Sequence, residues 1–412
     1  MLHPSKDIIS SKSNLLKGKR IVLCVCGSVS AIKAPDIARE LMRHGADVYP
    51  VMSKAASKII HPYLLEWATG NQTITELTGR IEHVEFCGLT ESKVDLVLVC
   101  PATANTISKS AYGIDDTPVT TFISTAIGSN IPVVFVPAMH ESLYRNPFVT
   151  ENINRLKNNG VIFIGPKVYE GKAKIADIED IIEAVISFFT PKILTNKRVI
   201  VTAGPTREYL DDVKYLSTPS SGKMGVEIAK ECAASGASVT LVCGPINVHV
   251  PTGITIISVS SCIEMFKAVE SSLRNNSYDY AFLAAAPVDF TFYKKHSGKI
   301  PSELEEVTVK LVQNPKISAE IKKISPKTIT IGFKAEYGTS LDELINRAYK
   351  RLIENNLDLI VANDVSRSDI AFGSDYNEVY VIDRSKNVIH IPKSSKREVA
   401  RRIIEVAVSV KC

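Results

Sequence analysis

Residues that could bind an anion are concentrated between positions 199 and 225 of the sequence. The β-branched run 199–201 predicts a buried strand, residues 203–206 predict a tight turn, and Ser221-Gly222-Lys223 predicts the start of a helix. The first turn of a helix presents free N–H groups, which attract phosphate. This stretch therefore indicates a phosphate site, and a purely structural turn remains the alternative on these residues alone.

Two common phosphate-binding loops do not match this stretch. Walker A requires a glycine where Ser217 stands and a serine or threonine where Met224 stands. The dinucleotide fingerprint requires a third glycine, which Gly222 and Gly225 lack. These differences count against an ordinary P-loop NTPase and an ordinary NAD dehydrogenase.

The elements around this loop predict a βαβ unit, and the chain contains a second segment of the same pattern. Residues 38–48 (ARELMRHGADV) resemble residues 229–239 (AKECAASGASV) position for position, and both read as helix, Gly-Ala, strand. We therefore expect an α/β protein with two doubly wound, Rossmann-like domains.

In the first domain, short apolar runs predict the strands, and small or polar residues follow several of them. The expected strands are 20–25, 47–52, 94–99 and 133–136, with a helix over 34–44. Asp177 is expected to cap a last helix, which Thr190-Pro191 ends. Ligands of open α/β sheets bind at the carboxyl ends of the strands, so the loops after these strands are the candidate site.

The second domain repeats this arrangement. Expected strands 280–284 and 357–362 end in Ala286-Pro287-Val288-Asp289 and Asn363-Asp364. Ser340 and Glu343 predict a capping box at the start of an amphipathic helix.

Length and composition limit the class of protein. A chain of 412 residues with a net charge of +5 suits two domains and anionic small substrates, whereas no dense basic tract favours nucleic acid. Residues 1–17 are expected to form a flexible tail, and no apolar run is long enough to span a membrane. The eight cysteines include no CxxC pair, so we expect no zinc site, buried thiols at Cys24 and Cys26, and a cytoplasmic protein.

A series of ordered motifs resembles the bifunctional coenzyme A biosynthesis flavoproteins, in which phosphopantothenoylcysteine decarboxylase is fused to phosphopantothenate–cysteine ligase. The motifs of the first half are CGSVSAIK, IEHVEF, PATANT with GIDD, and PAMHESLY. Those of the second half are TAGPTREYLDDVKYLS, SSGKMG, AAAPVDF, the KI of SGKIPS, LVQNP, GFKAE and LDLIVANDV. The resemblance implies a flavodoxin-like decarboxylase domain over 18–190 and a ligase domain over 191–412.

For the first domain, the resemblance implies an FMN site and a catalytic His83. The implied FMN contacts are Gly27, Ser28, Val29, Ser53, Thr103, Asn105, Thr106 and Ala138. Without the motif, His83 would be read as an ordinary surface or core histidine. In the family, the flavin oxidises the substrate's cysteine thiol to a thioaldehyde, and the carboxylate β to this electron sink then leaves as CO2.

Two positions of the first domain depart from the bacterial pattern. His140 stands where relatives have an asparagine that contacts the substrate carboxylate, and the flap IGPKVYEGKAKIADIED lacks their proton-donor cysteine. Lys172, Lys174, His140 and a bound water all remain candidates for the acid.

For the second domain, the resemblance implies that CTP activates the carboxylate of 4'-phosphopantothenate as an acyl-cytidylate, which the amine of cysteine then attacks. Lys299 matches the family's nucleotide lysine, and the other implied nucleotide contacts are Asp289, Asn314, Pro315, Phe333 and Arg351. Mg²⁺ would bind mainly through the triphosphate, with no metal site made by the protein. On its own, Lys299 would be read as a solvated charge.

Departures in the second domain leave CTP and ATP both open. Thr218 and Asn355 replace a family asparagine and a family lysine, and KIPS replaces KIKK. The family also implies a homo-oligomer that shares its FMN site between subunits, with a trimer-based first domain and a dimeric second domain. Two other functions remain: a ligase with an inactive or regulatory FMN-binding domain, and a peptidyl-cysteine decarboxylase fused to an unrelated nucleotide-binding domain.

Overall fold

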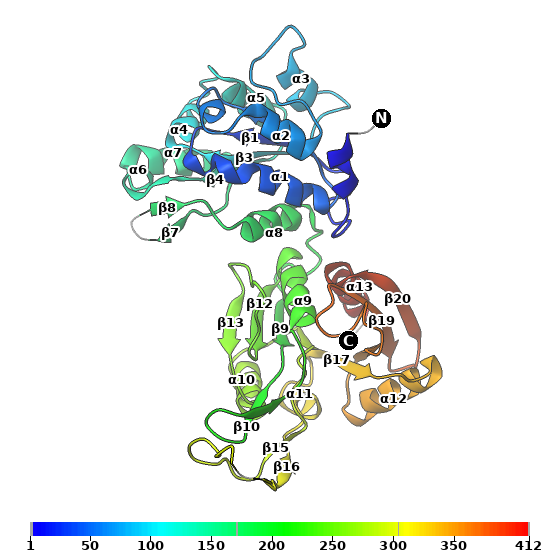
Figure 1. Cartoon of the computed structure of the whole chain (residues 1–412). Helices are drawn as coiled ribbons and strands as arrows, with labels where there is room; N and C mark the ends of the chain where they lie inside the picture. Colours follow the sequence, from blue (N-terminus) through cyan, green and yellow to red (C-terminus); the bar gives the residue numbers. More distant parts are fainter. Residues whose placement is uncertain (1–2, 170–171, 304, 411–412) are drawn as a thin grey trace. The chain divides into compact units, whose positions relative to one another are not determined.

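The computed structural model describes residues 3–169, 172–303 and 305–410 (Figure 1). The chain forms two compact units, Met1–Phe189 and Thr190–Cys412, each with its own central sheet and core. We call them the first and the second unit and describe each by itself. No described helix is long and apolar enough to cross a membrane.

The first unit is built on a parallel five-stranded sheet in the order β2-β1-β3-β4-β6. Its strands are β1 (Arg20–Val25), β2 (Asp47–Met52), β3 (Leu96–Ala102), β4 (Val133–Pro137) and β6 (Ile162–Phe163). Alternate residues of β1 enter two separate cores, since Ile21 and Leu23 face one side while Val22 and Cys24 face the other. The expected thiols Cys24 and Cys26 are indeed buried on one face.

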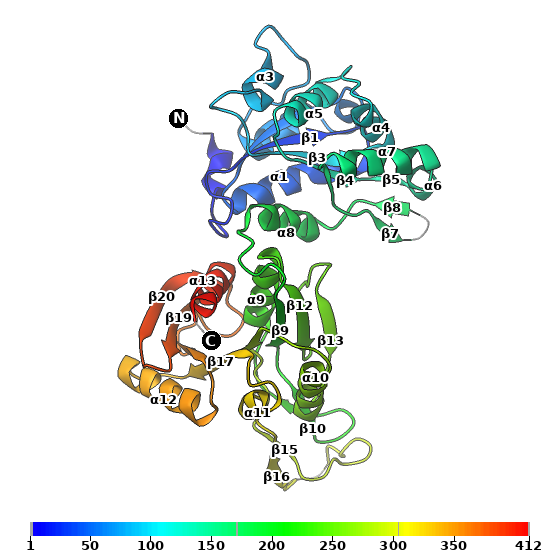
Figure 2. The same ribbon diagram turned by 180° about the vertical axis from the view of Figure 1, so that it is seen from behind.

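Helices cover both faces of this sheet, as Figures 1 and 2 show. One face packs against α1 (Ala34–Arg43) and α8 (Ile178–Phe189), and the other against α4 (Ala104–Ala111), α5 (Pro118–Gly128) and α7 (Pro147–Asn158). The remaining elements are η2 (Val29–Lys33), η3 (Ala56–Lys58), α2 (Pro62–Thr69), α3 (Glu82–Cys87), α6 (Glu141–Tyr144) and the short strands β5 (Met139–His140), β7 (Lys167–Tyr169) and β8 (Lys172–Lys174).

The expectation of a flexible tail over residues 1–17 was wrong for the described part of that segment. Residues Pro4–Ile8 form a 3-10 helix, η1, and Leu16 is fully buried. The backbone N–H groups of Ser10, Lys12 and Leu16 donate to the carbonyls of Met42, Arg43 and His44 at 3.0, 2.9 and 2.8 Å. The last carbonyls of a helix have no partner within it, so the segment is ordered because it satisfies the end of α1.

The second unit carries an eight-stranded sheet in the order β13-β12-β9-β14-β17-β18-β19-β20, of which the last two strands join antiparallel. Its strands are β9 (Arg198–Ala203), β12 (Ser238–Cys243), β13 (Thr255–Ser258), β14 (Tyr280–Leu283), β17 (Ile329–Glu336), β18 (Leu359–Asp364), β19 (Tyr376–Asp383) and β20 (Val388–Ser395). The two antiparallel strands were not expected from the sequence. The α/β class and the doubly wound architecture are confirmed.

Helices again cover both faces of the sheet. One core includes residues of α9 (Lys223–Ala234) and α13 (Lys396–Ser409), and the opposite one those of α10 (Cys262–Asn275), α11 (Ile317–Ile324) and α12 (Leu341–Glu354). Two small hairpin sheets, β10 (Arg207–Tyr209) with β11 (Tyr215–Ser217) and β15 (Phe290–Phe292) with β16 (Leu311–Gln313), lie outside the main sheet. Ser340 does cap α12, but the expected box is incomplete because the carboxylate of Glu343 pairs with Arg347 instead.

Candidate functional site

The implied flavin residues of the first unit lie at the carboxyl ends of four neighbouring strands. Gly27, Ser28 and Val29 follow β1, Ser53 follows β2, Thr103 follows β3, and Ala138 follows β4. From β1 the chain continues to β2 on one side of the sheet, whereas from β3 it continues to β4 on the other side. The sheet therefore has its topological switch point between β1 and β3, where open α/β sheets bind ligands.

The loop hydroxyls are arranged so that each keeps a proton to donate. Ser28 caps η2 by accepting from the N–H of Ser30 at 3.4 Å, and Ser53 accepts from the N–H of Ala56 at 3.2 Å. A serine that accepts through its oxygen can still donate its own proton to a phosphate. This donor set fits the phosphate of FMN.

Close packing explains why a glycine stands at the first of these loops. A Cβ built on Gly27 would lie 2.4 Å from the Cβ of Ala55, so the β1 and β2 loops approach each other too closely for a side chain. The loop after β1 therefore packs directly against the loop after β2 at the carboxyl end of the sheet.

The loop after β3 leads directly into α4. Of the implied flavin residues here, Thr106 is buried and Asn105 is exposed. Thr103 caps α4 by accepting from Thr106, and the two hydroxyls lie 3.2 Å apart, while Asn105 is exposed. Burial raises the pKa of the Cys26 thiol to about 11, although Thr106 hydrogen-bonds it. Cys26 is therefore a neutral packing group at neutral pH, and the exposed amide of Asn105 is the group available to a ligand.

His140 lies two residues after Ala138, at the end of β4. It caps α6, and its Nδ1 lies 3.0 Å from the hydroxyl of Ser142. The backbone of β5 pairs His140 with Lys172 of β8, so the flap strands β7 and β8 fold onto this end of the sheet. The side chain of Lys172 lies outside the described part of the structure, and that of Lys174 is exposed.

His83 is on α3, apart from the flavin loops. Its Nδ1 is buried with no hydrogen-bond partner among the described residues, and α3 packs against α5. No hydrogen bond between described residues joins His83 to the loops after β1, β2, β3 or β4. Within one chain, the described hydrogen bonds therefore do not connect the implied catalytic histidine to the flavin loops.

In the second unit, all the implied nucleotide residues except Lys299 line one cavity of about 90 Å³, which we call the Asn314 cavity. These residues are Asp289, Asn314, Pro315, Phe333 and Arg351. They come from the loop after β14, the turn after β16, strand β17 and helix α12. The fold therefore brings together residues that the sequence places far apart.

Hydrogen bonds fix the Asn314 turn against the loop that follows β14. The amide nitrogen of the Asn314 side chain donates to the carbonyl of Val288 at 2.9 Å, and its backbone N–H donates to the carbonyl of Asp289 at 2.8 Å. The N–H of Val288 in turn donates to the hydroxyl of Thr206 at 3.0 Å. The side-chain amide nitrogen of Asn314 is therefore hydrogen-bonded to the protein backbone, and Asn314 forms part of the cavity wall.

Cys262 also lines the Asn314 cavity, although it belongs to no local pattern that marks a site residue. Burial raises the pKa of its thiol to about 11, and the carboxylates of Glu208 and Asp289 act in the same direction. Cys262 therefore stays protonated at neutral pH and is no nucleophile.

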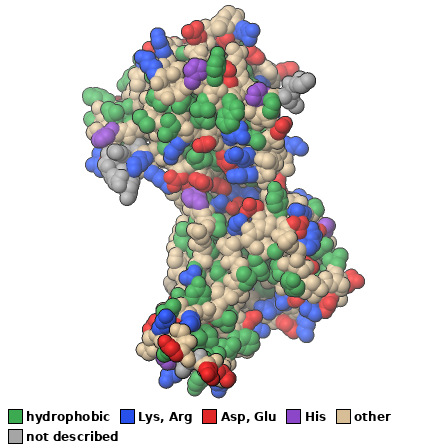
Figure 3. All heavy atoms as spheres, viewed as in Figure 1, with side chains coloured by type: hydrophobic (Ala, Val, Ile, Leu, Met, Phe, Trp, Pro, Cys, Tyr) green, Lys and Arg blue, Asp and Glu red, His purple; other side chains and the backbone are tan. Residues whose placement is uncertain are grey.

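Lys299 is exposed and lines neither this cavity nor the second one described below. It belongs to the segment between β15 and β16, over which charged side chains gather at the lower end of Figure 3. Asp211 fixes this segment by accepting from the N–H of Lys214 at 2.6 Å and from that of Ile300 at 2.9 Å. These backbone hydrogen bonds hold the pKa of Asp211 well below its usual range.

The predicted phosphate-binding stretch, residues 199–225, borders a second cavity of about 280 Å³ through residues 220–224. We call it the Lys396 cavity. Gly222 has φ +76° and is the N-cap of α9, which begins one residue later with no side-chain cap. A Cβ on Gly222 would lie 3.2 Å from the backbone of Gly204, so the two loops meet through glycines. The Asn314 and Lys396 cavities adjoin, because Ala285, Pro287, Asp289, Phe333 and Arg351 line both.

Two of the three departures of the second domain, Thr218 and Asn355, have structural roles. Thr218 donates to the carbonyl of Ala286 at 2.7 Å, next to both cavities. The side chain of Asn355 is buried and donates to the hydroxyl of Ser318, which lines the Asn314 cavity, at 3.0 Å. Within the described residues, no three His, Cys, Asp or Glu side chains lie close enough together to hold a metal ion.

Two family models match nearly the whole chain. The model described as "Flavoprotein" matches residues 9–190, and the model "DNA/pantothenate metabolism flavoprotein C-terminal domain" matches residues 194–410.

Full-length relatives are also found. The chain is 49% identical over 404 residues to the coenzyme A biosynthesis bifunctional protein CoaBC of Thermococcus kodakarensis, with 98% of each chain covered. It is 40% identical over 408 residues to the CoaBC protein of Methanocaldococcus jannaschii, with 98% of this chain and 97% of that relative covered. The crystal structure of the C-terminal domain of a CoaBC protein matches with 32% identity and a TM-score of 0.44, covering 53% of this chain and 96% of that one.

Proposed function

The chain belongs to the family of bifunctional coenzyme A biosynthesis proteins, and from this premise we propose which of its residues carry each reaction. The protein is an enzyme of coenzyme A biosynthesis with a flavoprotein decarboxylase unit and a ligase unit. The proposal adds that FMN is the flavin, that CTP is the activating nucleotide, and that 4'-phosphopantothenate and cysteine are the substrates.

The joined cavities of the second unit are the observation that supports the ligase proposal. A carboxylate and an amine form only a salt at neutral pH, so the carboxylate must first be activated. In our proposal the nucleotide occupies the Asn314 cavity, and the carboxylate reaches its α-phosphate where the two cavities meet. Arg351 lines both cavities and supplies positive charge at that junction. Mg²⁺ would arrive with the triphosphate.

In the first unit, we propose that the loops after β1 to β4 hold FMN. The hydroxyls of Ser28 and Ser53 would hold its phosphate, and Asn105 and the backbone beside Ala138 would hold the ring edge. When bound, the flavin supplies the redox chemistry that makes the carboxylate a leaving group. The residues of the chain bind the substrate carboxylate beside His140 and transfer the proton.

The separation of His83 from these loops supports a site shared between subunits of a homo-oligomer. Apolar side chains of η2, directly after the β1 loop, and of α2 are exposed in the single chain, namely Val29, Ile32, Tyr63 and Trp67. A second copy would bury such side chains and could supply its His83 to the flavin. The described cysteines are free thiols, which suits a reducing cytoplasm.

Lys299→Gln tests the ligase proposal. With nucleotide and 4'-phosphopantothenate but no cysteine, we expect the variant to lose pyrophosphate release about 100-fold or more, because in our proposal Lys299, which lines neither cavity in the single chain, supplies positive charge to the bound nucleotide. Lys294→Gln in the same exposed segment is the matched control and keeps its rate. Offering CTP and ATP in turn identifies the nucleotide. A Lys299→Gln variant as active as Lys294→Gln refutes the assignment.

The missing flap cysteine favours one alternative, a ligase whose flavin-binding unit is inactive or regulatory. The wild-type protein then releases no CO2 from 4'-phosphopantothenoylcysteine although it binds flavin. Release of CO2 at the rate of coupled turnover excludes this alternative.

A further inference from the structure

The short helix that carries His83 depends on its two ends for its position. Helix α3 has only six residues, which is too few for a helix to be stable by itself. Figures 1 and 2 show it at the margin of the first unit, after a long loop. The direction of the imidazole is therefore set by the contacts that fix the start and the end of α3.

Packing fixes the end of α3. Cys87 is fully buried, and the ring of Phe86 lies against those of Tyr49 and Phe122, with centroids 4.8 and 6.3 Å away. The N–H of Val94 donates to the carbonyl of Phe86 at 2.8 Å. These contacts hold the last turn of the helix, whereas the first turn, which includes the histidine, is fixed by other groups.

Glu82 fixes the start of α3. It is 9% exposed, and its carboxylate accepts from the backbone N–H of Thr78 at 3.0 Å and also from the hydroxyl of Thr78. The N–H of Ile81 donates to the carbonyl of Thr78 at 3.1 Å, which closes the segment 78–82 into what we call the Thr78 turn. The hydrogen bonds from Thr78 hold the pKa of Glu82 below its usual range, so the carboxylate is charged at neutral pH.

The Thr78 turn places Ile81 in a conformation that its side chain disfavours. Ile81 has φ +50° and ψ +49°, a left-handed conformation in which the Cβ of a non-glycine residue crowds its own carbonyl. Among the described non-glycine residues with positive φ, it is the only β-branched one. Such a residue occupies this region only where the surrounding structure compels it. We attribute the conformation of this turn to the hydrogen bonds that Glu82 accepts.

We propose that Glu82 is a positioning residue for the decarboxylation: by closing the Thr78 turn, it holds the imidazole of His83 in the orientation in which the ring meets the substrate. This rests on the proposed function, because the catalytic role of His83 is taken from it. The buried Nδ1 of that ring has no hydrogen-bond partner among the described residues that would orient it. The direction of the ring is therefore set through the backbone, from the turn that directly precedes it.

Steady-state kinetics of CO2 release by the full-length protein test this proposal. For Glu82→Ala we expect kcat for 4'-phosphopantothenoylcysteine to fall about 10- to 100-fold, because a small displacement of a reacting group has an effect of that size. KM, the flavin absorbance and the rate of ligation stay within about twofold, since in our proposal Glu82 touches neither substrate nor flavin. Glu91→Ala, at an exposed position in the loop after α3, is the matched control.

Two further variants separate positioning from other effects of the carboxylate. Glu82→Gln retains most of kcat, because its amide oxygen still accepts from the N–H of Thr78 and its amide nitrogen can donate to the hydroxyl. Thr78→Val removes one of the two hydrogen bonds to Glu82 and lowers kcat in the same direction. The double variant Thr78→Val with Glu82→Ala then has the kcat of Glu82→Ala, since both side chains act through one turn.

Each other outcome overturns the proposal. A Glu82→Ala variant with the kcat of Glu91→Ala shows that the turn does not position His83. An equal loss in Glu82→Gln shows that the charge itself acts, losses that add in the double variant show that the two side chains act separately, and a raised KM or lost flavin shows a general effect on the site. If the wild-type protein releases no CO2, the proposed function itself fails, whereas full activity of Glu82→Ala leaves that function intact.

Discussion

His83 carries an unused hydrogen-bonding atom in the first unit. Its Nδ1 is buried and without a partner among the described residues, which costs free energy unless a ligand or a second subunit uses the ring. We predict that His83→Asn lowers CO2 release from 4'-phosphopantothenoylcysteine about 10²- to 10⁴-fold, the usual contribution of a general acid or base. Flavin absorbance should be unchanged, because the flavin loops lie elsewhere.

His61→Asn is the control for this experiment. His61 caps α2 by accepting from the N–H of Tyr63, and asparagine can make the same cap. A His83→Asn variant with full decarboxylase activity, or one that has lost its flavin, contradicts the catalytic role.

The Lys396 cavity shows which site residues can be found from sequence. Lys223 was visible because it follows glycine at the start of a helix, a local pattern with a known use. Lys396 begins a different helix far along the chain and carries no local signal. Phe333 and Arg351, which we propose contact the nucleotide, were suggested only by the resemblance, since a phenylalanine in a strand and an arginine on a helix are ordinary structural residues.

At the scale of elements, the N-terminal segment is tied to α1 through Glu40. Burial alone would raise the pKa of Glu40, but hydrogen bonds from His44, Lys12 and Arg43 outweigh it and lower the pKa to about 2. An unfolded glutamate titrates near pH 4.3. The stabilisation is therefore complete above about pH 5, declines as the pH falls from about 4 to 2, and is absent below about pH 2.

We predict that Glu40→Gln destabilises the first unit by about 1 kcal/mol at pH 7, a value reduced for the part of the cluster that faces water. The difference from wild type should shrink as the pH falls to about 2. Urea unfolding followed by fluorescence measures it in the full chain, because Trp67 of α2 is the only tryptophan. Glu151→Gln, at an exposed position of α7, is the control, and a difference independent of pH contradicts the account.

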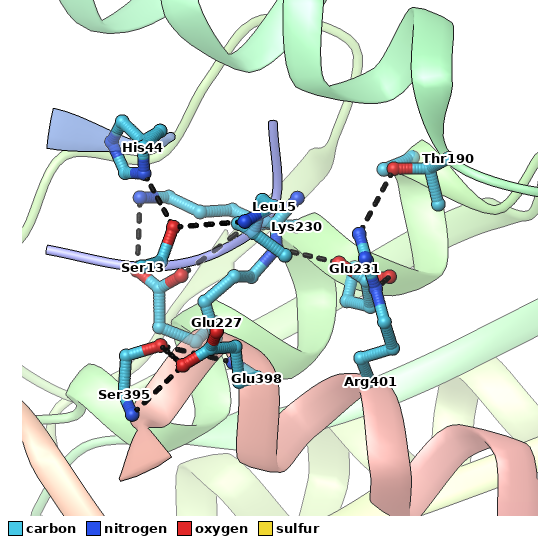
Figure 4. Close-up of polar contacts among 12 residues, drawn as sticks. Ser13, Leu15, His44, Thr190, Glu227, Lys230, Glu231, Ser395, Glu398 and Arg401 are labelled. Atoms are coloured by element: carbon cyan, nitrogen blue, oxygen red, sulfur yellow. Dashed lines mark hydrogen bonds and ion pairs between the residues drawn. The ribbon is translucent and has the colours of Figure 1, made fainter. Parts of the chain in front are cut away.

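Helices α9 and α13 are joined by a buried ion pair. Glu231, 1% exposed, accepts from Arg397 at 2.7 Å and from Arg401 at 2.8 Å, and Arg401 also donates to Thr190 at 3.3 Å (Figure 4). We predict that Glu231→Gln destabilises the second unit by about 3 kcal/mol, because the buried guanidinium of Arg397 loses its hydrogen-bonded counter-charge and keeps only the longer ion pair to Glu227, at 3.5 Å. Trp67 is in the first unit, so its fluorescence follows the unfolding of that unit. Calorimetry of the full chain also measures the unfolding of the second unit, where we expect the loss.

Two comparisons sharpen the test of this pair. Glu405→Gln breaks an exposed pair with Arg402 and should change stability by less than about 0.5 kcal/mol. The double variant Glu231→Leu with Arg397→Met removes both buried charges and should recover most of the loss. A single variant no less stable than Glu405→Gln shows that the pair does not stabilise the contact.

The parallel strands were predictable and the edge hairpin was not, for a physical reason. Parallel strands such as β1 and β9 are buried on both faces and therefore read as continuous apolar runs. In β20, half of the residues are polar or charged and much of the strand is exposed, so its sequence lacks that signal. The N-terminal segment likewise shows no helical or strand pattern, since its order comes from hydrogen bonds to the end of α1.

At the scale of the whole molecule, each unit has its own core, and in our proposal each reaction uses residues of one unit. Lys299 belongs to the second unit and His83 to the first. We therefore predict that Lys299→Gln loses ligation and keeps decarboxylation of added 4'-phosphopantothenoylcysteine. His83→Asn should lose decarboxylation and keep ligation.

The same separation predicts that the two inactive variants restore each other when mixed. With 4'-phosphopantothenate, cysteine and CTP, an equimolar mixture should make 4'-phosphopantetheine, because the ligated intermediate can pass through solution from one protein to the other. A lag in product formation that shortens as total protein rises would show this diffusion. Each variant alone should make far less product over the same time, and wild type diluted to half is the reference for the mixture. If each variant keeps its own half-reaction but the mixture stays inactive, the intermediate is not released, and the two units do not act independently.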